Sequence, residues 1–305
     1  MSGFPRVSGR PRRTSARRAT PPLAAAVAIE RCRRLDPVGD ALTGAIRGLL
    51  PAGRPKDLLS GTWLGHALHP ILTDVPIGAW TSSIVLDWVG GRRARPAADT
   101  LIALGILSAI PASLTGAADW GDTQRRERRV GLVHAAANSA ALGLYCVSLR
   151  ERRRGHRVRG RVLSLVGAGA LGAGGYLGGH LVFARGLGVD RTAFESRPED
   201  WVDAAAAADL TDGAPICVRV DGVGVLLARD AGEVHALADR CTHRGAPLHD
   251  GELRDGCVVC PWHQSTFRLT DGAVVRGPAT TPAPRYEVRV RDGRIELRAP
   301  REDVD

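Results

Sequence analysis

Cys241-Thr-His243-Arg-Gly245-Ala-Pro-Leu248, followed after residues 249–259 by Cys260-Pro-Trp-His263-Gln-Ser265-Thr-Phe267, is the most informative stretch of this chain. Each half of it carries one Cys and one His, with one residue between them in the first half and two in the second. Thiolates and imidazoles are side chains that bind transition metals. Two such pairs in short loops therefore predict a metal centre.

The pairing of the ligands indicates which metal binds. Zinc also takes two thiolates and two imidazoles, but zinc fingers place both Cys in one loop and both His on the following helix. One Cys and one His in each loop suits a two-iron, two-sulfide cluster. In such a cluster Cys241 and Cys260 bind one iron, and His243 and His263 bind the other. Structural zinc is the alternative.

At these positions the sequence resembles the Rieske family, whose paired loops have the patterns C-x-H-x-G-x-x-L and C-x-x-H-x-x-x-F/Y. The resemblance covers roughly residues 199–299 and implies a [2Fe-2S] cluster, an all-β domain of small antiparallel sheets, and electron transfer. It also implies which residues surround the ligands, namely Gly245, Leu248, Ser265 and Phe267.

Departures from the family pattern bear on the cluster potential. Quinol-oxidising Rieske proteins link the loops through two further Cys, and here Ala246 and Trp262 stand at those positions, so that disulfide cannot form. Those proteins also direct a Ser and a Tyr hydroxyl at the cluster sulfurs, which raises the potential. This chain keeps Ser265 but has Phe267 in place of Tyr. We expect a potential closer to roughly −150 mV than to about +300 mV. Gln264 replaces the Gly that usually follows the second His in this family.

From Glu199 the hydrophobic pattern alternates, and Asp-Gly pairs separate the short apolar runs, as in β-hairpins. Six strands are predicted: Ile216–Val220, Val223–Ala228, Glu233–Leu237, Cys257–Val259, Tyr286–Val290 and Arg294–Leu297.

The 305-residue chain has a net charge of +10, and its Arg residues stand in short clusters between apolar runs. This distribution is typical of charges that flank membrane segments, and no single basic face indicates nucleic-acid binding. Four apolar segments, at residues 70–89, 101–120, 130–149 and 162–184, have close to the roughly 20 residues that a helix needs to cross a bilayer. We predict an all-α transmembrane four-helix domain over residues 61–190, embedded in the lipid of a bacterial cell membrane. A soluble helical bundle is the alternative.

Residues 1–60 are predicted to be a basic, largely disordered tail, because they are rich in Arg and poor in apolar residues. Within the tail, residues 36–50 have the pattern of an amphipathic helix. We expect no secretory signal there.

Gly167-Ala-Gly169-Ala-Leu-Gly172 spells G-x-G-x-x-G, the fingerprint of dinucleotide-binding sites. The fingerprint is meaningful only between a strand and a helix, whereas here it lies inside an apolar segment. We expect these glycines to let helices approach closely, and we predict no NAD or FAD site.

Polar residues inside the apolar segments form a second candidate site, because they are costly in lipid. The candidates are His66, His69, His134, His180 and Asp74. His66 and His69, three residues apart, are expected to share one helical face, and all four His to lie toward the membrane face from which the β domain emerges. They would bind haem b, bind another metal or exchange protons with a quinone. Alternatively, they are hydrogen-bonded residues at helix ends.

The same region carries a second resemblance. The patterns His66-x-x-His69-Pro70, Asp74-x-Pro76-Ile-Gly78, His134-x-x-x-Asn138 and Gly178-Gly-His180 resemble a bacterial membrane-domain family of unknown function, often four-helical. That family implies no settled activity.

Together the patterns predict a membrane-anchored electron-transfer protein, an oxidoreductase component that passes electrons between its cluster and a redox partner protein, a quinone or haem. A complete Rieske oxygenase is not expected, because its catalytic iron domain would need more residues than follow the cluster loops. The alternative function is a membrane-anchored redox sensor or binding module without turnover. Arg residues on both sides of the apolar segments conflict under the positive-inside rule, and we expect the β domain on the cytoplasmic face.

Overall fold

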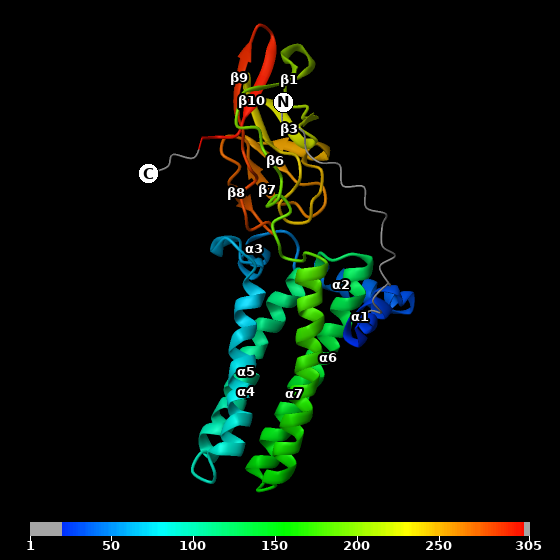
Figure 1. The fold of residues 1–305 in the computed structure, drawn as a ribbon, viewed down its shortest axis with the longest axis vertical. Helices are drawn as coiled ribbons and strands as arrows, with labels where there is room; N and C mark the ends of the chain where they lie inside the picture. The colour runs from blue at the N-terminus through cyan, green and yellow to red at the C-terminus, as the bar shows by residue number, and fades with distance from the viewer. Residues whose placement is uncertain (1–19, 302–305) are drawn as a thin grey trace, which may run out of the picture.

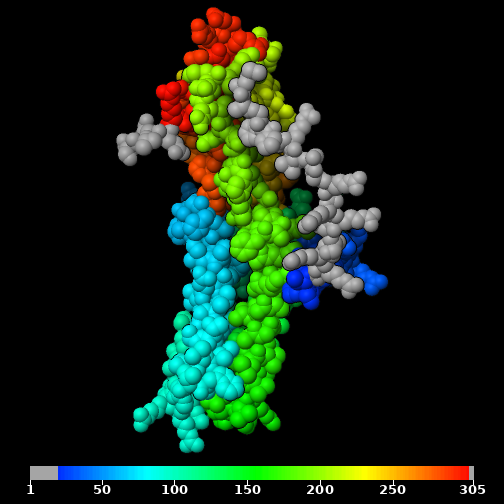
Figure 2. Space-filling view, viewed as in Figure 1, coloured from blue at the N-terminus to red at the C-terminus, as the bar shows by residue number. Residues whose placement is uncertain are grey.

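The computed structural model describes residues 20–301. It consists of a helical domain and a β domain stacked along the long axis of the molecule (Figure 1). Figure 2 shows the β domain seated directly on one end of the helical domain. The chain passes from one to the other through residues 185–201, which lie between the last helix and the first strand.

Four long helices form the main body of the helical domain, which we call the bundle. They are α4 (Leu68–Val89), α5 (Arg95–Gly121), α6 (Arg125–Arg153) and α7 (Arg157–Gly179), and a π-helical turn at His180–Ala184 extends α7. All four predicted apolar segments are thus confirmed as helices. Three of these helices, α5, α6 and α7 with its extension, are long and apolar enough to cross a membrane. The fourth, α4, is not one of these three and carries His69, Asp74 and Asp87.

The glycine pattern inside α7 has a packing role at one of its three positions. Gly167 lies against the ring of Tyr145 on α6, so a larger residue there would separate the two helices. Open space surrounds Gly169 and Gly172. Of these three glycines, only Gly167 shows the expected close approach of helices. Further along α7, Gly174 and Gly178 lie in the same way against Asn138 and His134 of α6.

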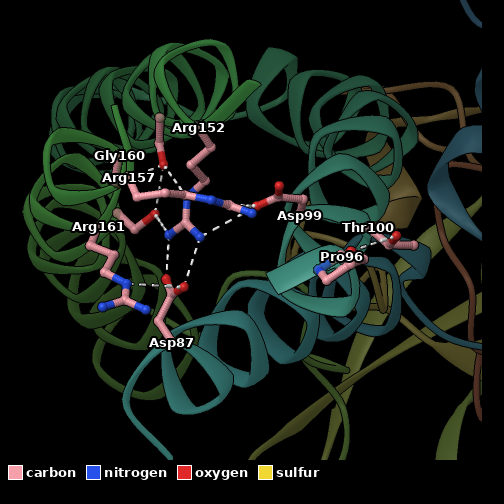
Figure 3. Close-up of polar contacts among 10 residues, drawn as sticks. Asp87, Pro96, Asp99, Thr100, Arg152, Arg157, Gly160 and Arg161 are labelled. Carbon is pink, nitrogen blue, oxygen red and sulfur yellow. Dashed lines mark hydrogen bonds and ion pairs between the residues drawn. The ribbon is translucent and has the colours of Figure 1, made fainter. Parts of the chain in front are cut away.

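A buried ionic network joins the four helices at the end of the bundle remote from the β domain. The fully buried side chain of Arg152 on α6 pairs with Asp87 of α4 and lies 3.5 Å from Asp99 of α5. Figure 3 shows its guanidinium between the two carboxylates. Arg157 and Arg161 of α7 approach Asp99 and Asp87 at 2.6 and 3.5 Å. Because a buried charge is costly without partners, this network fixes the four helix ends relative to one another.

The N-terminal region is more ordered than the sequence indicates. Residues 20–60 contain α1 (Pro21–Arg31), α2 (Asp36–Leu49) and α3 (Arg54–Ser60), so the expectation of a largely disordered tail is wrong for this part; residues 1–19 lie outside the described residues. The predicted amphipathic helix is confirmed as α2, which packs on α5 and α6. Apolar packing of Ala26 against Val130 and Leu177 and ion pairs such as Asp36 with Arg129 hold these helices on the bundle.

The β domain consists of three small antiparallel sheets, as expected. The first contains β1 (Val202–Ala206), β10 (Arg294–Arg298) and β9 (Glu287–Arg291); the second β2 (Ile216–Val220), β3 (Val223–Asp230) and β4 (Glu233–Ala238); the third β5 (Glu252–Arg254), β6 (Cys257–Val259), β7 (Thr266–Arg268) and β8 (Val274–Arg276). All six predicted strands are confirmed. Short 3₁₀ turns lie at Arg33–Leu35, Thr62–Leu64, Ala207–Asp209 and Leu248–Asp250.

Candidate metal centre

Two loops of the β domain adopt the same backbone turn. The first follows β4 and contains Cys241; the second joins β6 to β7 and contains Cys260. In each loop the Cys carbonyl accepts a hydrogen bond from the N–H four residues later, that of Gly245 at 2.8 Å and that of Gln264 at 3.1 Å. Both of these residues have positive φ, +76° and +64°. The turn therefore favours glycine at this position, and Gln264 occupies it at a conformational cost.

The loops bring the four predicted ligands together. Cys241 and Cys260 are buried, with 1% and 2% of their surface exposed. The rings of His243 and His263 lie 5.1 Å apart and are nearly perpendicular, at 84°. Nδ1 of each ring is buried and has no hydrogen-bond partner among residues 20–301. Two thiols and two unpaired ring nitrogens therefore meet between the loops.

Burial and crowding determine the protonation of these groups. Burial lowers the pKa of His243 well below its usual value and the pKa of His263 to about 4, so both rings are neutral at physiological pH. A hydrogen bond between the two sulfurs raises the pKa of Cys241 and lowers the pKa of Cys260 to about 7. Neutral imidazoles and a readily ionised thiol are the forms that bind metals.

This donor set fits a [2Fe-2S] cluster, which takes two thiolates on one iron and two imidazoles on the other. A buried polar atom without a partner costs free energy in a folded protein. Coordination of a metal through both Nδ1 atoms would remove that cost.

The residues expected around the ligands lie in the same core. Leu248 and Phe267 are fully buried, and Oγ of Ser265 accepts a hydrogen bond from the N–H of Ala279 at 2.9 Å. Phe267 presents no hydroxyl. None of the six Cys of the chain forms a disulfide in the structure.

Residues of the helical domain that the sequence analysis did not single out lie beside the ligands. Nε2 of His243 is 4.0 Å from Oδ2 of Asp122, which directly follows α5. Nζ of Lys56 in α3 is 2.6 Å from Oδ1 of the same carboxylate. Arg244, next to His243, pairs with Glu127 of α6. Lys56 and Asp122 are single polar residues far from the loops in sequence, so no local pattern could have identified them.

Further contacts hold the segment after β8 against α3 and the turn that follows α3. Oδ1 of Asp57 accepts a hydrogen bond from the N–H of Gly277 at 3.1 Å, and the hydroxyl of Thr62 donates to the carbonyl of Ala279 at 3.3 Å. Ala279 also bonds Ser265. The helical domain thus contacts the ligand loops and the segment that supports them.

The structure brings two of the four membrane-segment His together. The rings of His69 on α4 and His134 on α6 lie 6.4 Å apart. Nδ1 of His69 is 2.9 Å from the carbonyl oxygen of Ala112, and Nδ1 of His134 is 2.7 Å from that of Gly174. Each ring is therefore oriented by a backbone carbonyl of a neighbouring helix.

The other candidates lie elsewhere. His66 is exposed and precedes α4, which begins at Leu68, so the expectation that His66 and His69 share a helical face is wrong. Gly65, with φ of +86°, turns the chain before the helix. Nε2 of His180 is 2.7 Å from a carboxylate oxygen of Glu30 in α1. Asp74 is exposed on α4.

Comparison with known proteins gives two family matches. The Rieske [2Fe-2S] domain family matches residues 200–287, and DUF2231, a family of predicted membrane proteins, matches residues 65–191. The ferredoxin component of the naphthalene 1,2-dioxygenase/salicylate 5-hydroxylase systems of Ralstonia sp is 32% identical over 100 residues, which are 33% of this chain and 96% of that protein.

Two further relatives share the same segment. Apoptosis-inducing factor 3 of Homo sapiens is 36% identical over 104 residues, which are 33% of this chain but only 17% of that protein. Among solved structures, the ferredoxin of carbazole 1,9a-dioxygenase from Nocardioides aromaticivorans IC177 is 31% identical, with 34% of this chain and 100% of that chain covered and a TM-score of 0.32.

Proposed function

Because this chain belongs to the Rieske [2Fe-2S] family over residues 200–287 and to the DUF2231 membrane-protein family over residues 65–191, we propose that it is a membrane-anchored electron-transfer protein. The proposed cluster ligands are Cys241, His243, Cys260 and His263. The pair of buried, unpartnered Nδ1 atoms supports this assignment most directly. When bound, the cluster accepts and releases single electrons.

The protein surroundings assign each side of this site a role. The side of the site that holds Cys241 and Cys260 is shielded from water, because both residues lie in a buried apolar cluster with Phe267 and Leu248. The His side lies against Asp122 of the helical domain. Trp262, beside His263, is half-exposed and offers a partner an aromatic contact next to a ligand. The partner is a redox protein, as befits a chain similar to ferredoxin components of dioxygenase systems.

The bundle is the membrane anchor in this proposal. Helices α5, α6 and α7 carry exposed apolar side chains that would face lipid, among them Leu107, Ile110, Leu114, Val147 and Val166. We place the β domain on the cytoplasmic face. Labelling intact cells with a membrane-impermeant maleimide tests this, because Cys217 of the β domain is exposed. Labelling of Cys217 without cell lysis would contradict the cytoplasmic placement.

A second redox group is proposed between His69 and His134. Metal-ligating His residues usually donate their other ring N–H to a carbonyl, which is how Nδ1 of both rings is held here. The group is haem b or a quinone, and electrons pass between it and the cluster. Asn138, whose Nδ2 is 3.3 Å from Nε2 of His134, would have to turn away to free that nitrogen for a metal.

Optical and EPR spectra of the purified, detergent-solubilised protein test both proposals. A Rieske-type signal after dithionite reduction is expected, and it should be lost in His263→Gln but kept in the control His235→Gln, which alters a His on β4. Zinc and no iron–sulfur signal after anaerobic reconstitution with iron and sulfide would overturn the cluster assignment.

A reduced b-type haem band that is lost in His69→Leu would establish haem as the second group. Without that band, loss of quinone reduction in His69→Leu would indicate the quinone, and the absence of both effects would exclude the second group.

The alternative function, a redox sensor, predicts no turnover. Sustained electron transfer from a reductase to an external acceptor through the full-length protein would exclude a purely sensing role. A cluster that is reduced once and passes no electrons on would favour it.

A further inference from the structure

A cavity of about 610 Å³ lies between the helical domain and the β domain, and arginines dominate its walls. Arg125 and Arg126 come from the start of α6, Arg185 and Arg191 from the segment that links the domains, and Arg240 and Arg244 from the first ligand loop. The one acidic side chain in the lining is Glu127.

Carboxylates pair with only three of these six arginines. Arg244 pairs with Glu127, Arg185 with Glu30, and Arg240 lies 3.3 Å from Glu195. No ion pair joins Arg125, Arg126 or Arg191 to a carboxylate among residues 20–301. Three guanidinium groups around one cavity are thus left without a carboxylate partner. Arg125 and Arg126 are exposed and solvated, whereas Arg191 is partly buried, so the cost of an unpaired charge falls on Arg191.

Two buried nitrogen atoms point to the same conclusion. The side chain of Arg244 is 7% exposed, yet its Nη1 has no hydrogen-bond partner among the described residues. Nε of Arg191 is also buried and unpartnered there. Burial, followed by the charge of Arg244, lowers the pKa of Arg191 from its usual value. An anion in the cavity would accept hydrogen bonds from both residues.

The position and size of the cavity indicate the class of anion. Guanidinium groups match the geometry of phosphate oxygens and bind them in bidentate fashion. The volume exceeds that of a single phosphate and lies in the range of small-molecule sites, about 300–1,000 Å³. The cavity also lies where α6, one of the three helices able to cross a membrane, begins. If the bundle crosses a membrane, lipid headgroups would lie near this end of α6.

We propose that this arginine cavity binds a phosphate group, carried by an anionic phospholipid headgroup or by a soluble phosphate compound. The residues that bind it are Arg126, Arg191 and Arg244, and Arg125 also lines the cavity. Because Arg244 and Trp262 adjoin His243 and His263 in sequence, the bound anion would lie beside the ligand loops. None of the residues that line the cavity is itself a proposed cluster ligand.

Calorimetric titration of the full-length protein in a non-ionic detergent and phosphate-free buffer tests the proposal. The probes are inorganic phosphate, dihexanoyl phosphatidylglycerol and, as a zwitterionic control, dihexanoyl phosphatidylcholine. Saturable binding of one phosphate or one phosphatidylglycerol per chain is expected, and the probe that binds identifies the source. Binding of neither, or equally strong binding of phosphatidylcholine, would overturn the proposal.

Variants locate the bound anion. Arg191→Gln and Arg126→Gln should each weaken binding about tenfold, since each removes a charge-assisted hydrogen bond. The matched control is Arg93→Gln, an exposed arginine in the loop between α4 and α5 at the remote end of the bundle; it should bind as the wild type does. If all three variants bound the phosphate probe with equal affinity, the proposed location of the site would be wrong.

A measurement on the wild type covers the case in which a variant fails to fold. Phosphate or phosphatidylglycerol should raise the thermal unfolding temperature relative to chloride at equal ionic strength, because a ligand that binds only the folded state stabilises it. No such increase with either probe would contradict the proposal.

Discussion

Nε2 of His243 lies 4.0 Å from the carboxylate of Asp122, so a residue of the helical domain stands beside a proposed ligand in the β domain. Lys56 neutralises that carboxylate at 2.6 Å. The side chains of Asp122 and Lys56 are 3% and 8% exposed, so water screens the pair little. The helical domain therefore contributes electrostatically to the metal centre as well as supporting it.

Charge changes in this pair should shift the cluster potential in opposite directions. Reduction adds negative charge to the cluster, so Asp122→Asn should raise the midpoint potential by roughly tens of millivolts, and Lys56→Met should lower it by a similar amount. The amide introduced by Asp122→Asn keeps an oxygen that Lys56 can bond, which limits the loss of stability. Potentiometric titration followed by EPR measures both shifts.

The control for this prediction is Asp57→Asn. Asp57, like Lys56, belongs to α3 and contacts the β domain. Its carboxylate accepts a hydrogen bond from the N–H of Gly277 and does not approach a proposed cluster ligand. A shift as large as that of Asp122→Asn would mean that the contact between the domains, and not the charge beside His243, sets the potential.

Phe267 is expected to keep the potential low. It is fully buried in the core beneath the ligands and stands where quinol-oxidising Rieske proteins have a Tyr. Phe267→Tyr should raise the midpoint potential by roughly tens of millivolts, because a hydroxyl directed at a cluster sulfur stabilises the reduced state. Phe267→Leu, which alters the packing without adding a hydroxyl, should not reproduce the rise. A lower or unchanged potential in the Tyr variant would contradict this account.

Gln264 should be a site at which the β domain can be stabilised. Its φ of +64° lies in the left-handed region, which costs an L-residue about 1–2 kcal/mol. Replacement by glycine would remove that strain. Glycine also adds entropy to the unfolded chain, which offsets part of the gain. Gln264→Gly should therefore stabilise the domain by up to about 1 kcal/mol. Thermal unfolding monitored by loss of the cluster spectrum measures it. Gln264→Ala keeps the strained backbone and should bring no gain.

The β domain could be predicted well from the sequence, because its strands and turns are specified by residues that are close together in the chain. Asp221-Gly222 and Asp292-Gly293 both have positive φ at each residue, as the predicted tight turns require. Of the strands that were not predicted, β5, β7 and β8 have three residues each. Runs so short give little alternation to distinguish them from loops. The strand β6 has the same length but was predicted, because all three of its residues are apolar.

Long-range contacts were not predictable from the sequence. Residues 20–60 have the composition of a disordered tail, yet contacts such as that of Asp36 with Arg129, far along the chain, hold them on the bundle. The spacing of His66 and His69 fits a helix, but Gly65 and the start of α4 at Leu68 separate them. Asp122 acquires its role only when the β domain lies on the bundle.

The ionic network at the remote end of the bundle gives a prediction about stability alone. Asp87→Asn leaves the guanidinium of Arg152, whose side chain is fully buried, without its bidentate partner. Removing one partner of a buried ion pair costs about 3–5 kcal/mol, partly offset here by Asp99 at 3.5 Å. The thermal unfolding temperature of the bundle in detergent, followed by far-UV circular dichroism, should fall markedly.

The matched control for Asp87→Asn is Asp74→Asn on the same helix. Asp74 is exposed, so its replacement by the isosteric amide should change the unfolding temperature little. Because the network lies at the end of the bundle away from the ligand loops (Figure 1), the EPR signal of folded Asp87→Asn protein should match that of the wild type. Equal unfolding temperatures for the two variants would show that Arg152 needs no partner at Asp87. A changed EPR signal would show that the remote end of the bundle is coupled to the metal centre.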